Sequence, residues 1–503
     1  MKRFTRDVFL IALATGISRV FGLFRDVVIA NQFGAGEAYD AFLVAFFLPH
    51  FLRRLLAEGA LSTAFIPVYT DSLVNKNDAD RFASNVLSWL GVIFPLLVAA
   101  GVLLAPGYLP FLASGFPPDK LGLTLRLAQI LFSFIAFVGI AAVFMGILNG
   151  HHRFFVPAVA PVMFNLGAIA GVLILADYLG RPIYGLAVGV LLGGAGQLLI
   201  QLPALRRIGF RFRFTLIPLH PGVRRMVRLM APATIALAVA QINLMVDNKL
   251  ASHLGDGGIS SLQYAMRLFQ LPLGVFAISI ATALLPRFAS TAAQRQQERF
   301  SHYLRDGISS TVFFLLPAMA GLYVIGNDII RLFFEHGGFT AADTLRTTHV
   351  LSFYTIGILF YGLVYIFTRA LYSMGRSMVP VMASSLAVAA NIGFDLLLVG
   401  RMQEGGLALA TSISGIVNAF VLALFLWPRI KPVKALRARL TKILVGSGAA
   451  FLIVWGLRVI VGDTSPAIAV FLPLSVTVVF YLIYARACGL WNLLTMSEPD
   501  HPG

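Results

Sequence analysis

Residues 124–149 read TLRLAQILFSFIAFVGIAAVFMGILN, and Arg126 is the one charged side chain in this stretch. An α-helix needs about 20 predominantly apolar residues to cross the ~30 Å hydrocarbon core of a bilayer. The stretch therefore predicts a membrane-spanning helix. Its continuous apolar character also argues against an outer-membrane barrel, whose strands are segments of about 10 residues with alternating hydrophobicity.

Similar apolar runs recur along the whole chain of 503 residues, of which 58% are hydrophobic and 12% charged. That charged share is about half of the usual ~25% and excludes a water-soluble protein. The runs predict an all-α polytopic membrane protein with fourteen transmembrane helices, at residues 8–30, 41–69, 83–112, 124–149, 156–176, 182–204, 228–252, 262–286, 307–334, 347–373, 378–399, 405–428, 442–461 and 466–486.

The connections between these helices differ in charge. The chain has 39 Lys and Arg against 22 Asp and Glu. We expect most of this excess positive charge to set the orientation of the helices in the membrane, since residues 206–228 and 429–442 are rich in Lys and Arg. Residues 30–40, 253–261 and 462–465 contain neither. The positive-inside rule therefore predicts that both termini lie in the cytoplasm. We read the stretch at 206–228 as an anchor for anionic lipid and expect no nucleic-acid partner.

Short sequence motifs recur along the chain at a nearly constant spacing. Ile11–Ala14 recurs as Ile235–Ala238, and Leu48-Pro49 recurs as Leu271-Pro272. The spacing spans six predicted helices, an even number, so both halves have the same orientation and form a parallel repeat. This predicts an N-lobe of six helices, a C-lobe of six helices and a C-terminal pair of helices, at residues 1–222, 223–430 and 431–503.

Arginines inside the predicted membrane helices are the main functional signal. At the centre of a helix such a side chain costs about 2.5 to 3.5 kcal/mol on the insertion scale, so it faces a cavity or a partner. Local pairing is a fair explanation for Arg54, which has Glu58 one turn later, and a partial one for Arg19, since Asp26 lies seven residues on and returns to the same face. For all but Arg54, a shared cavity that binds a phosphate or diphosphate is expected, because guanidinium groups bind phosphate through paired hydrogen bonds. These are Arg19, Arg25, Arg53 and Arg267.

A second group of polar residues lies in the later helices. Asn391 and Asp395 are one turn apart and share a face, as do Leu407 and Thr411, and Asp247 lies in the seventh helix. Carboxylate, amide, hydroxyl and backbone carbonyl oxygens suit a hard cation such as Na⁺. The alternative, in which the acids are capped by hydroxyls or paired with an arginine, remains open. No Walker A, HExxH or GxSxG motif occurs where it could function, so the sequence does not predict an enzyme.

The first seventy residues carry the most specific motifs. They include Ser18-Arg19-Val-Phe-Gly-Leu-Phe-Arg25-Asp26, Phe33-Gly34-Ala-Gly36, Leu52-Arg53-Arg54 and Ala57-Glu58-Gly59-Ala60, and Phe334-Glu335-His-Gly-Gly-Phe339-Thr340 follows later. Together they closely resemble the MurJ (MviN) family of lipid II flippases. The resemblance implies the multidrug/oligosaccharidyl-lipid/polysaccharide exporter (MOP) fold, with two lobes in a V and a groove for a polyprenyl tail made by the last two helices.

The resemblance also implies roles for individual residues. The substrate-binding residues would be Arg19, Arg25, Arg53, Arg54, Arg267, Asp40 and Glu58, and the sodium ligands would be Asp247, Asn391, Asp395, Thr411 and the Leu407 carbonyl. The chain departs from some relatives at Met266 and Gln270, where they have acids, and at Phe47, where they have lysine. These departures weaken proton coupling and favour Na⁺, and no other cofactor is expected.

The expected function is a flippase in the bacterial cytoplasmic membrane. It would move undecaprenyl-diphosphate-linked disaccharide-pentapeptide from the inner to the outer leaflet by alternating access, driven by membrane potential, Na⁺ or both. Membrane lipids and cell-wall synthesis proteins would be its partners. Two alternatives remain: a cation-coupled multidrug or polysaccharide-lipid exporter of the same superfamily, which would favour an acidic, aromatic cavity, and a scaffold for cell-wall enzymes that transports nothing.

Overall fold

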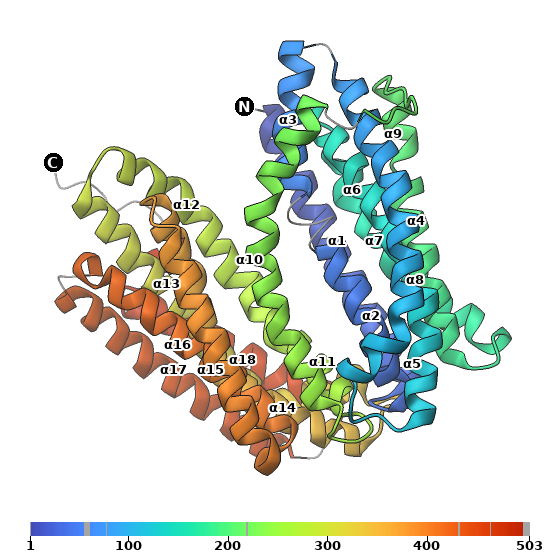
Figure 1. The fold of residues 1–503 in the computed structure, drawn as a ribbon. Helices are drawn as coiled ribbons and strands as arrows, with labels where there is room; N and C mark the ends of the chain where they lie inside the picture. Colours follow the sequence, from blue (N-terminus) through green and yellow to red (C-terminus); the bar gives the residue numbers. More distant parts are fainter. Residues whose placement is uncertain are drawn as a thin grey trace. The chain divides into compact units, whose positions relative to one another are not determined.

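The computed structural model describes residues 2–54, 61–76, 78–217, 220–430, 433–462 and 464–495. Across these ranges every regular element is a helix (Figure 1). Eleven of the helices found there are long and apolar enough to cross a membrane. The all-α polytopic fold class is therefore confirmed. The spans expected at 8–30, 41–69 and 228–252 each include residues that are not fully described, so the total of fourteen remains a prediction.

The contacts divide the chain into two compact units, Met1–Ser260 with Gly337–Phe339, and Ser261–His336 with Thr340–Gly503. The first unit contains α1 (Lys2–Phe33), α2 (Glu37–Arg53), α3 (Leu61–Asp71), η2 (Ser72–Lys76), α4 (Ala79–Leu112), α5 (Pro118–Leu131), α6 (Phe134–Gly150), α7 (Phe155–Ala170), η3 (Gly171–Leu175), η4 (Ala176–Tyr178), α8 (Pro182–Leu199), α9 (Leu202–Arg207) and α10 (Pro221–Ala251). The division falls in the first turn of α11 (Gly258–Pro272).

The second unit continues from α11 through η5 (Leu273–Ala277), α12 (Ile278–Ala293), α13 (Gln297–Phe334), α14 (Ala341–Ser373), α15 (Met378–Met402), α16 (Glu404–Ile430), α17 (Val433–Val461), α18 (Pro466–Ala487) and α19 (Asn492–Thr495). The division differs from the predicted lobe boundary at residue 222, because α10 contacts α3 and α4 and so belongs to the first unit. The lobes were predicted from the repeat rather than from contacts, and they remain a prediction.

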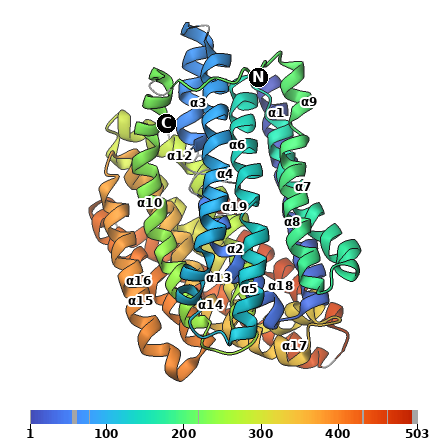
Figure 2. The same cartoon turned by 45° about the vertical axis from the view of Figure 1, so that its right-hand side comes forward.

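In the first unit, glycines allow α7 and the η3 segment that follows it to pack closely against α8. Gly167 and Gly171 face a Gly-x-x-x-Gly spacing on α8, where a Cβ added at Gly167 would lie 2.4 Å from the Gly193 nitrogen, and one added at Gly171 would lie 2.3 Å from the Gly185 oxygen. Small residues permit such close approach of membrane helices. α7 also contacts α1, while α6 contacts both α4 and α8 (Figure 2).

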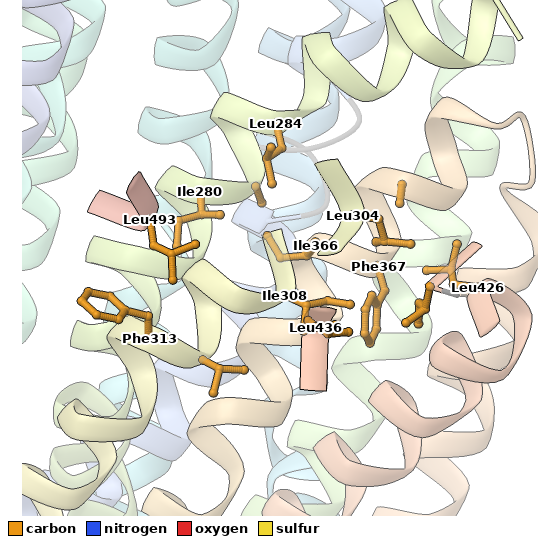
Figure 3. Close-up of a cluster of buried hydrophobic side chains, with 14 of the residues drawn as sticks. Ile280, Leu284, Leu304, Ile308, Phe313, Ile366, Phe367, Leu426, Leu436 and Leu493 are labelled. Atoms are coloured by element: carbon orange, nitrogen blue, oxygen red, sulfur yellow. The ribbon is translucent and has the colours of Figure 1, made fainter. Parts of the chain in front are cut away.

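The second unit has a large apolar core. Side chains from α12, α13, α14, α16, α17 and α19 pack together there (Figure 3): Ile280, Leu284, Leu304, Ile308, Phe313, Ile366, Phe367, Leu426, Leu436 and Leu493. An ion pair adds to this packing, since Arg458 Nε of α17 lies 2.6 Å from Oδ2 of the buried Asp328 on α13. The predicted C-terminal pair of helices is thus attached to α13, which α17 and α18 both contact.

Two motifs that lie 300 residues apart in the sequence meet at the end of α1. Gly34 adopts a positive φ of 59°, and a Cβ added to it would lie 2.2 Å from the carbonyl oxygen of Gly338. The backbone N–H of Gly338 donates to the Asn31 carbonyl at 2.6 Å. Only glycine fits this approach, because any side chain would collide with backbone atoms. Residues Gly337–Phe339, between α13 and α14, therefore pack on α1 and belong to the first unit.

Candidate functional site

Two of the predicted cavity arginines meet over one aromatic ring. Arg25 lies in α1, Arg53 is the last residue of α2, and Phe164 lies in α7. The guanidinium carbons of Arg25 and Arg53 are 5.5 and 5.7 Å from the centroid of the Phe164 ring. Both distances fall within the ~6 Å range of cation–π attraction. The structure thus brings together two cations that are 28 residues apart in the sequence.

Arg25 is held by two further side chains. Its Nε and Nη2 donate to Oδ1 of Asp26 at 3.0 and 2.6 Å, and its Nη1 donates to Oδ1 of Asn165 at 3.0 Å. The buried Asn165 also donates through Nδ2 to the Ser18 carbonyl at 3.2 Å. Asn165 therefore links α7 to α1 twice and fixes the plane of the guanidinium group. Charge-assisted bonds of this kind are about twice as strong as neutral ones.

The ring beneath the arginines belongs to an aromatic cluster. The cluster consists of Phe46 of α2, Phe134 of α6 and Phe164. The ring centroids are 5.3 Å apart for Phe46 and Phe134, 5.6 Å apart for Phe134 and Phe164, and 6.3 Å apart for Phe46 and Phe164. Phe134 is completely buried. Aromatic pairs at these distances contribute about 0.5–1.5 kcal/mol beyond their area burial, so Phe164 has a defined position. The two guanidinium groups therefore lie on a rigid support.

The other predicted substrate residues are placed differently. Arg19 is exposed on α1, and Arg54 is half-buried directly after α2. Arg267 is half-buried on α11 and belongs to the second unit, so its membership of a shared cavity remains a prediction. Glu58 lies outside the described residues. The role assigned to these residues in substrate binding remains a prediction.

Asp40 lies in a buried polar network. Its Oδ2 accepts from Lys120 Nζ at 2.9 Å and from the Gly257 N–H at 2.8 Å, and its Oδ1 accepts from the N–H of Ser260 at 2.8 Å and from the Ser260 hydroxyl. Lys120 Nζ also lies 2.8 Å from Oδ1 of Asp256. The network joins α2, α5, the connection before α11 and the first turn of α11. Asp40 is thus engaged by protein donors here, and its predicted contact with substrate remains a prediction.

Four of the predicted sodium ligands belong to neighbouring helices of the second unit. Asn391 Nδ2 donates to Oδ2 of Asp395 on α15, and both side chains are buried. On α16, the Thr411 hydroxyl donates to the Leu407 carbonyl at 3.0 Å. α15 and α16 contact each other. Together the two helices carry carboxylate, amide, hydroxyl and carbonyl oxygens, which are the ligand types that a hard cation prefers.

The fifth predicted ligand, Asp247, lies in α10 of the first unit, where its Oδ2 accepts from Asn243 at 3.2 Å. The predicted set is therefore divided between the two units. Within the described ranges no group of three or more His, Cys, Asp or Glu residues is placed to hold a metal ion. The sodium site remains a prediction.

Three residues of these networks were missed by the sequence reasoning: Phe164, Asn165 and Lys120. A phenylalanine or an asparagine in an apolar helix is unremarkable, because neither carries the insertion cost that singles out an arginine. Lys120 follows Asp119 in the first turn of a helix, where charged residues are common. The tertiary contact of α7 with α1 gives the first two their importance, and no local pattern encodes that contact.

Comparison with known proteins gives a consistent result. The family model described as "Lipid II flippase MurJ" matches residues 29–476. A Rhizobium meliloti protein named "Probable lipid II flippase MurJ" is 36% identical, with 82% of this chain and 79% of that relative covered. A Thermotoga maritima protein of the same name is 35% identical, with 84% of each covered.

Solved structures match as well. The structure titled "Lipid II flippase MurJ, inward closed conformation" is similar with a TM-score of 0.82 and 29% identity, covering 97% of this chain and all of that one. An inward-facing multidrug resistance MATE family transporter of the MOP superfamily matches with a TM-score of 0.65 and 17% identity, over 84% of this chain and 95% of that one. The second likeness concerns the fold alone.

Proposed function

The chain belongs to the lipid II flippase MurJ family, and from that membership we propose that it moves lipid II from the inner to the outer leaflet. The protein is a multi-pass membrane protein of the bacterial inner membrane, and its family is one of transporters rather than of enzymes. The observation that supports substrate binding most directly is the pair of guanidinium groups over Phe164.

The chemistry of the pair suits a lipid-linked diphosphate. Each guanidinium group can form two parallel hydrogen bonds to phosphate oxygens, which a lysine cannot do. Asp26, Asn165 and Phe164 hold Arg25 in place before substrate arrives, and Phe164 does the same for Arg53. Preorganisation of this kind increases affinity, because less side-chain entropy is lost on binding.

The proposed cycle is alternating access with both termini in the cytoplasm. Arg19 and Arg267 would complete the diphosphate site, and Asp40, Arg54 and Glu58 would contact the headgroup or shape the cavity. Membrane potential, worth about 2.3 kcal/mol per elementary charge per 100 mV, would bias the return of the empty carrier. Na⁺ held by Asn391, Asp395, Thr411, the Leu407 carbonyl and Asp247 would add to that bias. Cell-wall synthesis proteins are the proposed protein partners.

The Asn165→Ala variant tests the positioning of Arg25. We expect lipid II flipping in proteoliposomes to fall at least tenfold, because a hydrogen bond to a charged group contributes about 1.5–3 kcal/mol and each ~1.4 kcal/mol is a factor of ten. The measurement is the rate at which fluorescent lipid II becomes accessible to a membrane-impermeant reagent. The control is Asn327→Ala, which removes another interhelical bond, to Thr348, in the second unit. Equal rates for the two variants would contradict the role of Asn165.

The Asp395→Asn variant tests the sodium proposal. We expect the melting temperature of the wild-type protein in detergent to rise when K⁺ is replaced by Na⁺ at constant ionic strength, since a ligand at about 100 times its Kd stabilises by about 2.7 kcal/mol. The variant is expected to lose this rise. Asp328→Asn is the control, because Asp328 is another buried acid of the same unit and lies outside the predicted ligand set. A full Na⁺ response in Asp395→Asn would exclude this site.

A further inference from the structure

The connection between α9 and α10 contains an extended segment, residues 210–217, which we call the strap. The strap is docked along α4 by its backbone. Every second residue donates its N–H to a buried polar side chain: Arg213 to Ser84 Oγ at 3.1 Å, Thr215 to Ser88 Oγ at 2.9 Å and Ile217 to Asn85 Oδ1 at 2.8 Å. Asn85 Nδ2 returns a bond to the Ile217 carbonyl at 3.1 Å. The strap is therefore fixed in position rather than loosely tethered.

The sequence of the strap alternates between two kinds of side chain. It begins Phe210-Arg211-Phe212-Arg213-Phe214, and in an extended chain successive side chains point to opposite faces. One face thus carries the arginines and the other the phenylalanines. Both faces are open, because the strap meets α4 along its edge: Phe212 is 53% exposed, Phe214 is 69% exposed, and both arginines are exposed.

The docking site on α4 lies where that helix leaves the hydrocarbon. A helix of 34 residues is about 51 Å long at ~1.5 Å per residue, well beyond the ~30 Å hydrocarbon core. Ser84, Asn85 and Ser88 lie within its first ten residues. Trp89 follows, with its Nε1 3.5 Å from the Ile217 carbonyl oxygen, and tryptophan is enriched at membrane–water interfaces. The strap thus lies at the level of the lipid headgroups.

We propose that the strap is a binding site for anionic phospholipids of the surrounding leaflet. Its phenylalanines lie at the boundary of the acyl chains, and Arg211 and Arg213 bind the phosphate groups. Residues 201–217 contain no acidic side chain, and the exposed Arg206 and Arg207 of α9 extend the positive charge. A clustered basic segment next to a membrane helix attracts anionic lipid. These lipids are not the transported substrate, so the inference does not depend on the proposed flippase activity.

The test compares two lipids of equal acyl chains and different headgroup charge. The purified full-length protein is heated in detergent with phosphatidylglycerol or with phosphatidylcholine, and the difference between the two melting temperatures is the selectivity. We expect the wild-type protein to melt higher with phosphatidylglycerol. Arg211→Gln/Arg213→Gln should lose at least half of the selectivity, whereas Arg211→Lys/Arg213→Lys should retain most of it.

The matched control is Lys434→Gln/Arg437→Gln, which removes the same charge from exposed positions of α17. It should keep the wild-type selectivity. The proposal is overturned if the strap variant keeps full selectivity, or if the control loses as much, because net charge alone would then explain the result.

A second measurement does not depend on the stability of the arginine variants. Phe214→Cys and Thr215→Cys are each made in a Cys488→Ser background, and the new cysteine is labelled with a fluorescent dye. The labelled proteins are placed in vesicles whose lipid carries bromine, a quencher of the dye, near the glycerol end of its acyl chains. The two positions lie on opposite faces of the strap. We expect the dye at 214 to be quenched at least twice as strongly as the dye at 215, and equal quenching would contradict the proposed orientation.

Discussion

We expect Arg53→Ala to abolish growth of a strain that is depleted of its own lipid II flippase and depends on this chain. Truncating one partner of a desolvated charged pair costs about 2–5 kcal/mol, which corresponds to a fall of roughly 30-fold to several thousand-fold in binding. Arg53→Lys keeps the charge and loses the planar fork, so partial growth is expected. The measurement is colony formation on depletion, with an immunoblot of the membrane fraction to show that each variant is present.

Two further variants sharpen the result. Arg376→Ala removes an exposed arginine in the turn between α14 and α15 and should support normal growth. Arg267→Ala is expected to fail as completely as Arg53→Ala if the second unit contributes to the same site. Normal growth of Arg53→Ala would count against the diphosphate site over Phe164. Normal growth of Arg267→Ala alone would confine the site to the first unit. Failure to accumulate inward-facing lipid II on depletion would instead favour an exporter of another substrate or a scaffold.

Asp40→Ala is expected to give the largest loss of stability. The substitution leaves the Lys120 ammonium, which is 1% exposed, with Asp256 as its remaining carboxylate in the network. Removing one partner of a buried pair costs about 3–5 kcal/mol. Lys120→Met should cost less, because Asp40 would keep the N–H groups of Gly257 and Ser260 and the Ser260 hydroxyl as donors. The measurement is the melting temperature of the purified protein.

An exposed ion pair of the same unit provides the control. Arg225 and Asp71 are 2.8 Å apart, with side chains 55% and 29% exposed. Such pairs contribute about 0–1 kcal/mol, so Asp71→Ala should barely change the melting temperature. In the double variant Asp40→Ala/Lys120→Met the loss should be smaller than the sum of the single losses, as expected for residues in contact. An Asp40→Ala protein that melts no earlier than Asp71→Ala would show that the network does not stabilise the fold.

The fold class could be predicted because long continuous apolar runs are typical of helices that cross a membrane and are rare in water-soluble proteins. The boundaries could not be predicted as well. The run at 124–149 reads as one helix, whereas α5 begins at Pro118 and ends at Leu131, and α6 begins at Phe134. The apolar pattern also cannot show which helices pack together, so the membership of α10 in the first unit had no sequence signal.

The candidate site could be predicted only where a residue type is costly in its surroundings. Arg25 and Arg53 stand out because a cation in an apolar run requires an explanation, and the structure places them together. Phe164 and Asn165 could not be found in this way, since their type is ordinary and their importance depends on the packing of α7 against α1. Spacing along a helix correctly predicted that Asn391 and Asp395 share a face, and the structure adds the hydrogen bond between them.

The contact between Gly34 and Gly338 has a practical consequence for mapping the orientation of this protein with inserted tags. The turn at Gly337–Phe339 connects two long helices and is a natural choice for an insertion, yet its backbone touches the end of α1, and an epitope placed there would displace that helix. The turn at Gly180 is a better choice, because a Cβ added there would meet nothing within 4 Å. A failed insertion at the first position would report on lost packing, whatever side of the bilayer the loop occupies.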